Sequence, residues 1–392
     1  MGEWKKYELR QVAEIFTGFP FKGDQYEMAG NLKVVRGENV TVGNLRWDTE
    51  KYWNHSTEKL EEYFLQSGDI VIGMDGSKVG HNRAIIGQNQ LPLILAQRVA
   101  RLRAKSNFDQ NFLWYQIFNE KFVDYVEAIH TGTSIPHISP TQIGDFEFRV
   151  PVLVDEQKAI AEVLGSLDDK IDLLHRQNKT LESLAQTLFR QLFIEEADDR
   201  WETKTVGDVA VINELSIDKD YEHKDIEYLD TGSITDNIVS EYQYLSLEEA
   251  PSRAKRIVKN NDIIISTVRP IHRHYGLLKS VNPNTIVSTG FCVISCTKID
   301  PHFLYIFLTQ KEMTEYFDVI AEGSTSAYPS LKPSDISSVD FKMPPPDLLK
   351  KFSDYASDAW QKLEINKAQI QSLSSLRDQL LPKLMSGKLS PM

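Results

Sequence analysis

The sequence predicts an α+β fold in which two related mixed α/β domains are joined by two long antiparallel helices that form a coiled coil. Two observations carry this prediction: a series of motifs that occurs twice in the same order, and a heptad stripe after each copy. The chain has 392 residues, of which 41% are hydrophobic, enough for two sizeable cores. We expect domains at 1–152 and 197–345, long helices at 153–196 and 346–392, and an approximate two-fold axis between the halves.

The first half of the chain returns in the second half, segment by segment. "WKKYELRQVAEIF" at Trp4 returns as "WETKTVGDVAVIN" at Trp201, and "SGDIVIGMDGSKVG" returns as "NNDIIISTVRP". The aromatic helix pattern "NFDQNFLWYQIF" returns as "KIDPHFLYIFLT". "IPHISPTQIGDFEFRVP" returns as "YPSLKPSDISSVDFKMP", directly before each long helix. Four matches in one order predict one structural unit that occurs twice, and the fourth pair marks the junction of each unit with its helix.

Each copy is followed by positions that alternate in spacings of four and three, the pattern of a coiled-coil seam. The alternative is that each stripe packs only on the core of its own domain. Two matched stripes of this length favour packing of the stripes on each other. The first stripe is Ile160, Leu164, Leu167, Ile171, Leu174, Asn178, Leu181, Ala185, Leu188 and Leu192. The second is Phe352, Ala356, Ala359, Leu363, Asn366, Ile370, Leu373, Arg377, Leu380 and Leu384.

One asparagine in each stripe predicts the direction of pairing. The stretch from Ile160 to Asn178 is as long as the stretch from Asn366 to Leu384. An antiparallel pairing therefore places Asn178 opposite Asn366, whereas a parallel pairing does not. A buried asparagine costs stability unless a polar group pairs with it, and such pairs fix the register of a seam. We expect the two amides to meet, and we expect Pro382 to weaken the last turn of the second helix.

Charge is distributed unevenly along the chain. The net charge of -12 argues against a nucleic-acid partner, because phosphate binding needs local positive potential. Yet residues 76–108 contain no acidic residue, and Asp262 is the only acid in residues 250–299, while both stretches are rich in lysine and arginine. Each half of this acidic chain therefore carries one basic region.

The basic regions contain loops whose residue types suit DNA. Arg, Lys, Asn and Gln read base edges, while Arg, Lys, Ser, Thr and backbone amides hold phosphates. A solvated basic loop, a solvent-facing strand at 101–105, and ordinary turns before the two junctions are the alternatives. The candidate DNA contacts are Asp75, Ser77, Lys78, His81, Asn82, Arg83, Arg101, Arg103, Thr133, Ser134 and His137 in the first half, and Arg253, Arg256, Arg269, His272, Arg273, His274, Ser324, Thr325 and Tyr328 in the second.

The chain shows no constellation typical of an enzyme. "GMDGSKVG" lacks the spacing of a phosphate-binding loop, and "HRH" at His272 lacks the acids or thiolates of a metal site. Cys292 and Cys296 are the only cysteines, so a disulfide framework or zinc ribbon is not expected. The first residues, "MGEWKKYELR", are polar where a signal peptide would need an apolar core, and no apolar run approaches the length of a membrane span. We expect a cytoplasmic protein with no catalytic residue, no metal site and no membrane contact.

Taken together, these motifs resemble the DNA-specificity subunit of type I restriction-modification systems over nearly the full chain. "GDIVIGMDGSKVG" and "NDIIISTVRP" are similar to the family's strand and polar loop, and "ISPTQIGDFEFRVPVLVDEQKAIAEVLGSLDDKID" is similar to the end of a target-recognition domain. "LRDQLLPKLMSGKLS" is similar to the family's C-terminal end. The second copy departs from the pattern, with "PDLLKKF" in place of "DEQKAIA", which puts contacts of that Glu-Gln pair in doubt for the second half.

The resemblance implies a non-enzymatic subunit that binds double-stranded DNA. Each target-recognition domain would read one half of a bipartite, asymmetric target, and the coiled coil would set the spacer between the halves. The partners would be two modification subunits and, for restriction, two restriction subunits. This chain would hold no cofactor: S-adenosylmethionine would be in the modification subunits, and ATP and Mg would be in the restriction subunits.

Two other functions remain open from the residues alone. A nuclease with an unrecognised site would cut DNA as the purified chain. A coiled-coil scaffold that does not read DNA would show no salt-dependent, sequence-selective binding that is lost on substitution of Arg83 or Arg273.

Overall fold

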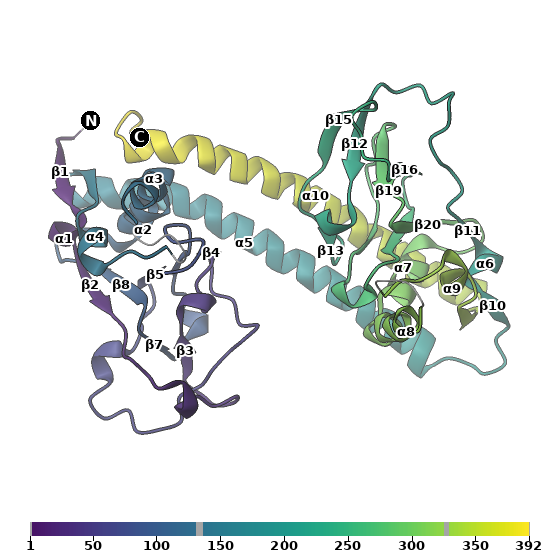
Figure 1. The fold of residues 1–392 in the computed structure, drawn as a ribbon, viewed down its shortest axis with the longest axis horizontal. Coiled ribbons are helices and arrows are strands. Elements are labelled where there is room, and N and C mark those ends of the chain that lie inside the picture. The colour runs from purple at the N-terminus through teal and green to yellow at the C-terminus, as the bar shows by residue number, and fades with distance from the viewer. Residues whose placement is uncertain (1, 131–135, 325–328, 392) are drawn as a thin grey trace. The chain divides into compact units, whose positions relative to one another are not determined.

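The computed structural model describes residues 2–130, 136–324 and 329–391 and divides into two compact units (Figure 1). The first unit comprises 1–173 with 369–392, and the second comprises 174–368. The division falls inside both long helices, α5 (Val154–Arg190) and α10 (Pro346–Met385). Each unit therefore combines one copy of the repeat with a segment of each long helix.

The first unit is built on an antiparallel sheet of order β2-β8-β5-β6, to which β4 adds in parallel to β6. A second, parallel pair joins β3 to β7, and an antiparallel pair joins β1 to β9. The strands are β1 (Trp4–Glu8), β2 (Ala13–Thr17), β3 (Lys33–Val35), β4 (Val42–Gly43), β5 (Ile70–Gly73), β6 (Arg83–Ile85), β7 (Leu93–Leu95), β8 (Val99–Ala104) and β9 (Glu147–Pro151). The helices are α1 (Leu9–Val12), α2 (Gln110–Phe118), α3 (Glu120–Ile129) and α4 (Pro140–Gly144).

The second unit repeats this plan. Its main sheet has the order β11-β20-β17-β18, and a second sheet has the order β15-β12-β19-β16. The strands are β10 (Thr203–Thr205), β11 (Ala210–Ile212), β12 (Asp225–Leu229), β13 (Ile234–Thr235), β14 (Ile238–Val239), β15 (Gln243–Ser246), β16 (Ala254–Ile257), β17 (Ile263–Ser266), β18 (Tyr275–Leu277), β19 (Thr285–Ser288), β20 (Phe291–Cys296) and β21 (Asp340–Lys342). The helices are α6 (Val206–Val209), α7 (Pro301–Thr309), α8 (Lys311–Glu322) and α9 (Pro333–Ser337), and a π-helical turn, Gln191–Glu195, follows α5. The α+β class and the two related domains predicted from the repeat are confirmed.

The two copies agree in detail at a buried aspartate that precedes the central strand of each sheet. Asp69 Oδ2 accepts a hydrogen bond from the Gln66 N–H at 2.7 Å, and Asp262 Oδ2 accepts one from the Lys259 N–H at 2.7 Å. Both side chains are almost fully buried. Their second oxygens differ in partner, because the first copy supplies the guanidinium of Arg103 and the second supplies only the Ser295 hydroxyl.

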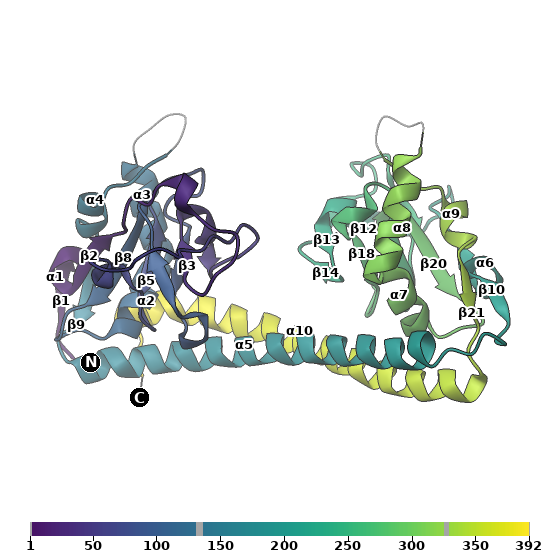
Figure 2. The ribbon, with the colours of Figure 1, turned by 90° about the horizontal axis from the view of Figure 1, so that it is seen from below.

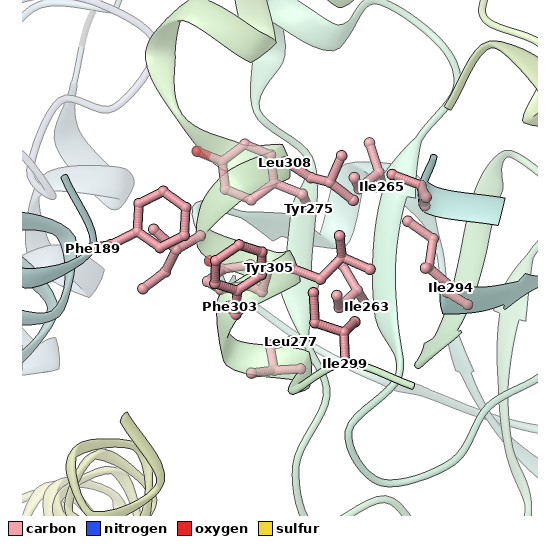
Figure 3. Close-up of a cluster of buried hydrophobic side chains, with 14 of the residues drawn as sticks. Phe189, Ile263, Ile265, Tyr275, Leu277, Ile294, Ile299, Phe303, Tyr305 and Leu308 are labelled. Carbon is pink, nitrogen blue, oxygen red and sulfur yellow. The ribbon is translucent and has the colours of Figure 1, made fainter. Parts of the chain in front are cut away.

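The long helices complete the core of each unit. In the second unit, α7 lies between the sheet and α5, and Phe189 of α5 faces Phe303 and Tyr305 of α7 (Figure 3). The ring centroids of Phe189 and Phe303 are 5.1 Å apart, and Phe193 lies 5.3 Å from Phe352 of α10. In the first unit, α2 lies alongside α5, where the Tyr115 hydroxyl donates to Asp168 Oδ2 at 2.7 Å (Figure 2). Stripe residues such as Ala185 and Leu192 in the second unit and Leu164 in the first belong to the same cores, so the stripes pack on the domains as well as on each other.

The stripes pair in the predicted antiparallel register within each unit. In the second unit, Asn366 Nδ2 donates to Asn178 Oδ1 at 2.8 Å. In the first unit, Ile160 shares a core with Leu384, and Arg377 Nη1 lies 2.9 Å from Asp168 Oδ1. Helix α10 runs through Pro382 and ends at Met385. The expected weakening by Pro382 is therefore confined to the end of the helix, where Gly387, with a φ of +69°, lets the Lys388 N–H reach the Lys383 carbonyl.

The amide pair gives a test of register. Asn366 is fully buried, so Asn178→Leu leaves it without its polar partner and should lower the free energy of unfolding by about 1–3 kcal/mol. The double variant Asn178→Leu/Asn366→Leu replaces both amides and should recover most of that loss. Thermal unfolding of the full chain measures both effects, and a double variant as unstable as the single one would contradict the pairing.

The two buried aspartates give a test of pH dependence. Burial raises the pKa of Asp262, against the opposing hydrogen bonds from Ser295 and Lys259. Because the folded chain holds this proton more tightly than the unfolded chain, Asp262 favours folding at low pH, and this contribution is lost as the pH rises through the folded pKa. Asp262→Asn should therefore remove this group's contribution to the pH dependence of the melting temperature, which is lost from the unsubstituted chain as the pH rises above about 4.

Asp69→Asn is the matched comparison at the equivalent position of the first unit. It breaks the ion pair with Arg103, whose side chain is mostly buried, and should destabilise the chain at pH 7 by about 1–3 kcal/mol. Melting curves of both variants across this pH range distinguish the two environments. If both variants lost the same melting temperature at pH 7, the ion pair with Arg103 would not distinguish Asp69 from Asp262.

Candidate nucleic-acid interface

In the second unit, backbone hydrogen bonds bring three basic or polar segments to one edge. The Thr289 N–H donates to the Arg253 carbonyl at 2.8 Å, and the Thr267 N–H donates to the Gly290 carbonyl at 2.8 Å. The Leu331 N–H then donates to the Thr267 carbonyl at 2.7 Å. The residue before β16, the loop 267–274 after β17 and the segment before α9 therefore lie next to one another.

The first unit has the same arrangement. The Met74 N–H donates to the Arg98 carbonyl at 2.9 Å, and the Ile138 N–H donates to the Met74 carbonyl at 2.8 Å. Asp75 forms a β-bridge with His137, as Val268 does with Ser330 in the second unit. The structure thus joins, in each unit, the two candidate segments that are separate in the sequence. We call these two regions the first edge and the second edge.

Four candidate residues, Thr133, Ser134, Thr325 and Tyr328, lie outside the described residues. Ser324 is described, and its hydroxyl oxygen accepts a hydrogen bond from the Ser330 N–H at 3.3 Å. Ser324 is therefore placed within the second edge.

At the first edge, Ser77, Lys78 and His137 are exposed, and Asn82 is half-buried. His81 Nε2 lies 3.1 Å from Glu127 Oε1 on α3. Asp75 is mostly buried and accepts a hydrogen bond at 2.8 Å from Arg98, which is itself 68% exposed. Arg98 was not among the candidate contacts; its place in the acid-free stretch 76–108 was the signal that could have included it.

At the second edge, the exposed candidates are Arg253, Arg269, His272 and Arg273. Arg273 Nη2 lies 2.7 Å from Asp236 Oδ1, and its Nε donates to the Tyr275 hydroxyl, which raises the pKa of Arg273. The remaining two candidates are more enclosed, since His274 Nδ1 lies 2.6 Å from the Ile234 carbonyl and half-buried Arg256 donates to the Ser216 hydroxyl at 3.0 Å. The second edge therefore presents its positive charge mainly through the loop 267–274 and Arg253.

Arg83 is corrected from a candidate DNA contact to a structural residue. It is 2% exposed, and its guanidinium donates to the carbonyls of Gly80, His81 and Phe118 at 2.9, 3.0 and 2.7 Å. Burial lowers the pKa of Arg83 to about 10. In the second unit, the Tyr275 hydroxyl takes the equivalent position and lies 3.5 Å from the Thr309 carbonyl, at the C-terminal end of α7. Both side chains donate a hydrogen bond from the strand after the loop, β6 or β18, to a carbonyl at the end of a helix, α2 or α7.

Arg101 and Arg103 are corrected in the same way. Arg101 is 3% exposed, donates to Glu14 Oε1 at 2.9 Å, and has a pKa lowered by burial and then by neighbouring Arg103. Arg103 Nη2 donates to buried Asp69 at 2.8 Å, and this pairing raises the pKa of Arg103. Arg101 is therefore buried and Arg103 half-buried, and both pair with acids, from β2 and from the residue before β5, instead of forming an open phosphate track.

The described residues hold no group of three or more His, Cys, Asp or Glu side chains that could bind a metal ion. Among them, Cys292 and Cys296 are free thiols, and burial raises the pKa of each to about 12. No helix in the described part of the chain is long and apolar enough to cross a membrane. What the two edges offer chemically is hydrogen-bond donors, hydroxyls and positive charge on a fixed backbone.

Comparisons with known proteins agree with this chemistry. The family model described as "Type I restriction modification DNA specificity domain" matches residues 1–183 and 198–375. The type I restriction enzyme MjaIX specificity subunit of Methanocaldococcus jannaschii is 24% identical over 424 residues, which cover 99% of this chain and 96% of the relative. The HindI specificity subunit of Haemophilus influenzae is 27% identical over 183 residues, 46% of this chain and 39% of that relative.

Among solved structures, the S subunit of a type I restriction-modification system from M. genitalium has the same fold. It superposes with a TM-score of 0.64 at 16% identity, over 98% of this chain and 96% of that one. The family model matches twice, once on each copy of the repeat, and the matches together span most of the chain. The chain therefore belongs to the type I restriction-modification DNA specificity family, whose members recognise the DNA target.

Proposed function

We propose that this chain reads two unlike half-sites of a bipartite, asymmetric DNA target, one with each edge. The observation that carries the proposal is that equivalent backbone hydrogen bonds hold the two edges, which carry different side chains. Equivalent hydrogen bonds from Gly76 to Pro136 and from Arg269 to Pro329 hold the two loops, at 3.0 and 3.1 Å. On this common frame the first loop exposes Ser77 and Lys78, whereas the second exposes Arg269 and His272. Different donors on one frame would select different base sequences.

The chain itself is proposed to be non-catalytic. The edges carry donors and hydroxyls suited to phosphates and base edges, and the buried thiols have pKa values too high for nucleophiles at neutral pH. Methyl transfer would be the work of two modification subunits that bind S-adenosylmethionine. Cleavage would need two restriction subunits that use ATP and Mg, and this chain would hold no cofactor of its own.

The long helices are proposed to set the spacer between the two half-sites. Each helix contributes to the core of both units, so neither unit can rotate or slide on its helical segment without disrupting a packed core. The amide pair of Asn178 and Asn366 holds the register between the helices. A fixed helical connection would favour one spacing of half-sites over others.

Substitutions of Lys78 and Arg83 distinguish a residue that contacts DNA from a residue that stabilises the fold, within one loop. Lys78→Ala should leave thermal stability unchanged and weaken target binding, with the slope of log affinity against log salt falling by about 1 if the lysine holds a phosphate. Arg83→Ala should destabilise the chain by about 2 kcal/mol or more, because three carbonyls lose their donor. Melting curves and fluorescence-anisotropy titrations at several salt concentrations measure both.

Arg83→Lys is the matched control, since it keeps the charge but not the three-way donation. It should still lose stability. An Arg83→Ala variant that melts like the unsubstituted chain but binds DNA weakly would return Arg83 to the group of DNA contacts.

A longer helical connection should change the spacer alone. One heptad inserted after Leu174 and one before Ile370 keep the stripe and its antiparallel register and lengthen the pair by about 10 Å, or about 3 base pairs. Methylation mapping in a host that carries the modification subunits should find both half-sites unchanged and the spacer altered.

The control inserts a heptad after Leu174 only, which shifts the two stripes out of register. It should lower the melting temperature and reduce methylation. An unchanged spacer with the double insertion would refute the role of the helices as a ruler.

A further inference from the structure

The loop of the second edge holds two aliphatic side chains in solvent. Val268 is 40% exposed and Ile271 is 50% exposed, on either side of buried Pro270. Single exposed aliphatic residues are ordinary on protein surfaces, so exposure alone does not indicate a function. Ile271 differs from such residues in its backbone, in the charge around it and in its contrast with the first edge.

The backbone holds Ile271 in a fixed place. Ile271 lies in a short 3₁₀ turn between Arg269 and Arg273, whose φ angles of +48° and +59° are left-handed and uncommon for residues other than glycine. The Ile271 N–H donates to Asp318 Oδ1 at 3.3 Å, and the Arg273 N–H donates to the Pro270 carbonyl at 2.8 Å. Uncommon backbone held by surrounding contacts is typical of functional sites.

The charge around Ile271 matches a DNA groove. Exposed Arg269 and Arg273 flank the same turn, Arg273 being paired with Asp236, and Arg253 belongs to the same edge. Cationic groups on this edge would lie against phosphates, which places the aliphatic side chain between them at the base edges. In the major groove the apolar group that a base pair offers is the 5-methyl group of thymine.

The first edge lacks this feature. Its loop exposes Ser77 and Lys78, while its own aliphatic residue, Val79, is buried at 4% exposure. The two loops therefore differ in kind, since one presents polar donors and the other presents an aliphatic side chain between cations. A difference of this kind is what two unlike half-sites require.

We propose that Ile271 contacts the 5-methyl group of a thymine in the half-site bound by the second domain. This inference rests on the proposed function and deepens it, because it assigns one chemical feature to one half-site. It requires an A·T pair in that half-site and makes Ile271 a specificity-determining residue.

Deoxyuridine, which differs from thymidine only by the methyl group, tests the contact directly. The full chain is purified with its modification subunits, and each thymine of the mapped target is replaced singly. At one thymine the replacement should weaken binding about fourfold, which corresponds to about 0.8 kcal/mol at about 1.4 kcal/mol per tenfold. The complex with Ile271→Ala should bind the natural duplex more weakly than the unsubstituted complex does. Its affinity should not fall further when that thymine is replaced by deoxyuridine.

Three control variants accompany this measurement. Ile194→Ala removes an isoleucine of similar exposure, 49%, in the turn after α5. The complex with this variant should still bind about fourfold more weakly when deoxyuridine replaces the thymine. The complex with Lys78→Ala, in the first edge, should show the same fourfold fall in affinity on deoxyuridine replacement. Ile271→Val retains most of the side chain and should show a smaller effect, which guards against a folding defect in the alanine variant.

The proposal is overturned if the target contains no thymine that responds to deoxyuridine, or if Ile271→Ala responds as strongly as the unsubstituted chain. Failure of the proposed function would appear differently. In that case the unsubstituted complex would bind the mapped target no better than a scrambled duplex, before any thymine is changed.

Discussion

The core of each unit is completed by apolar helical surface from sequence positions outside the repeat copy that it stabilises. In the first unit, Leu381 and Leu384 from the end of α10 pack with residues of the N-terminal domain. In the second unit, Phe189 from α5 and Phe193 from the π-helical turn that follows it are in the core with Phe303 of α7. Burial of one such side chain contributes about 1.5–3 kcal/mol. Neither copy of the repeat therefore buries its core with its own residues alone, and the paired helices are a structural requirement as well as a connection.

The two copies share one backbone frame and differ in the loops that the frame holds. The main sheets keep the same strand order, the same buried aspartate and the same tie between the strand after the loop and the end of a helix. That tie is made by the Arg83 guanidinium in one copy and by the Tyr275 hydroxyl in the other. Because the frame holds the loop at both ends, we expect the exposed residues between those ends to tolerate substitution without loss of stability. The proposed reading of two different half-sites needs this freedom.

The sequence located the basic regions but did not distinguish structural from exposed cations. Arg101 and Arg103 alternate along a strand, as a phosphate track would, yet Arg101 is buried and Glu14 and Asp69 pair with the two arginines. These acids are far from the arginines in sequence, so local patterning carries no sign of them. Lys78 and Arg83 belong to one basic loop, and only the packing of Phe118 and the loop carbonyls makes one of them structural.

The repeat, the heptad stripes and the antiparallel amide pair could be derived from the sequence by itself, because each depends on spacing along the chain. Matched lengths on either side of Asn178 and Asn366 are enough to predict which residues meet. Only the tertiary structure decided which cations face solvent and how the loops are held. The left-handed backbone at Arg269 and Arg273 is held by the Pro329 carbonyl and by the Asp236 N–H, which belong to distant segments. Long-range hydrogen bonds and ion pairs leave no periodic pattern in a sequence, so the exposed surface that we propose for DNA binding is defined only when the chain is folded.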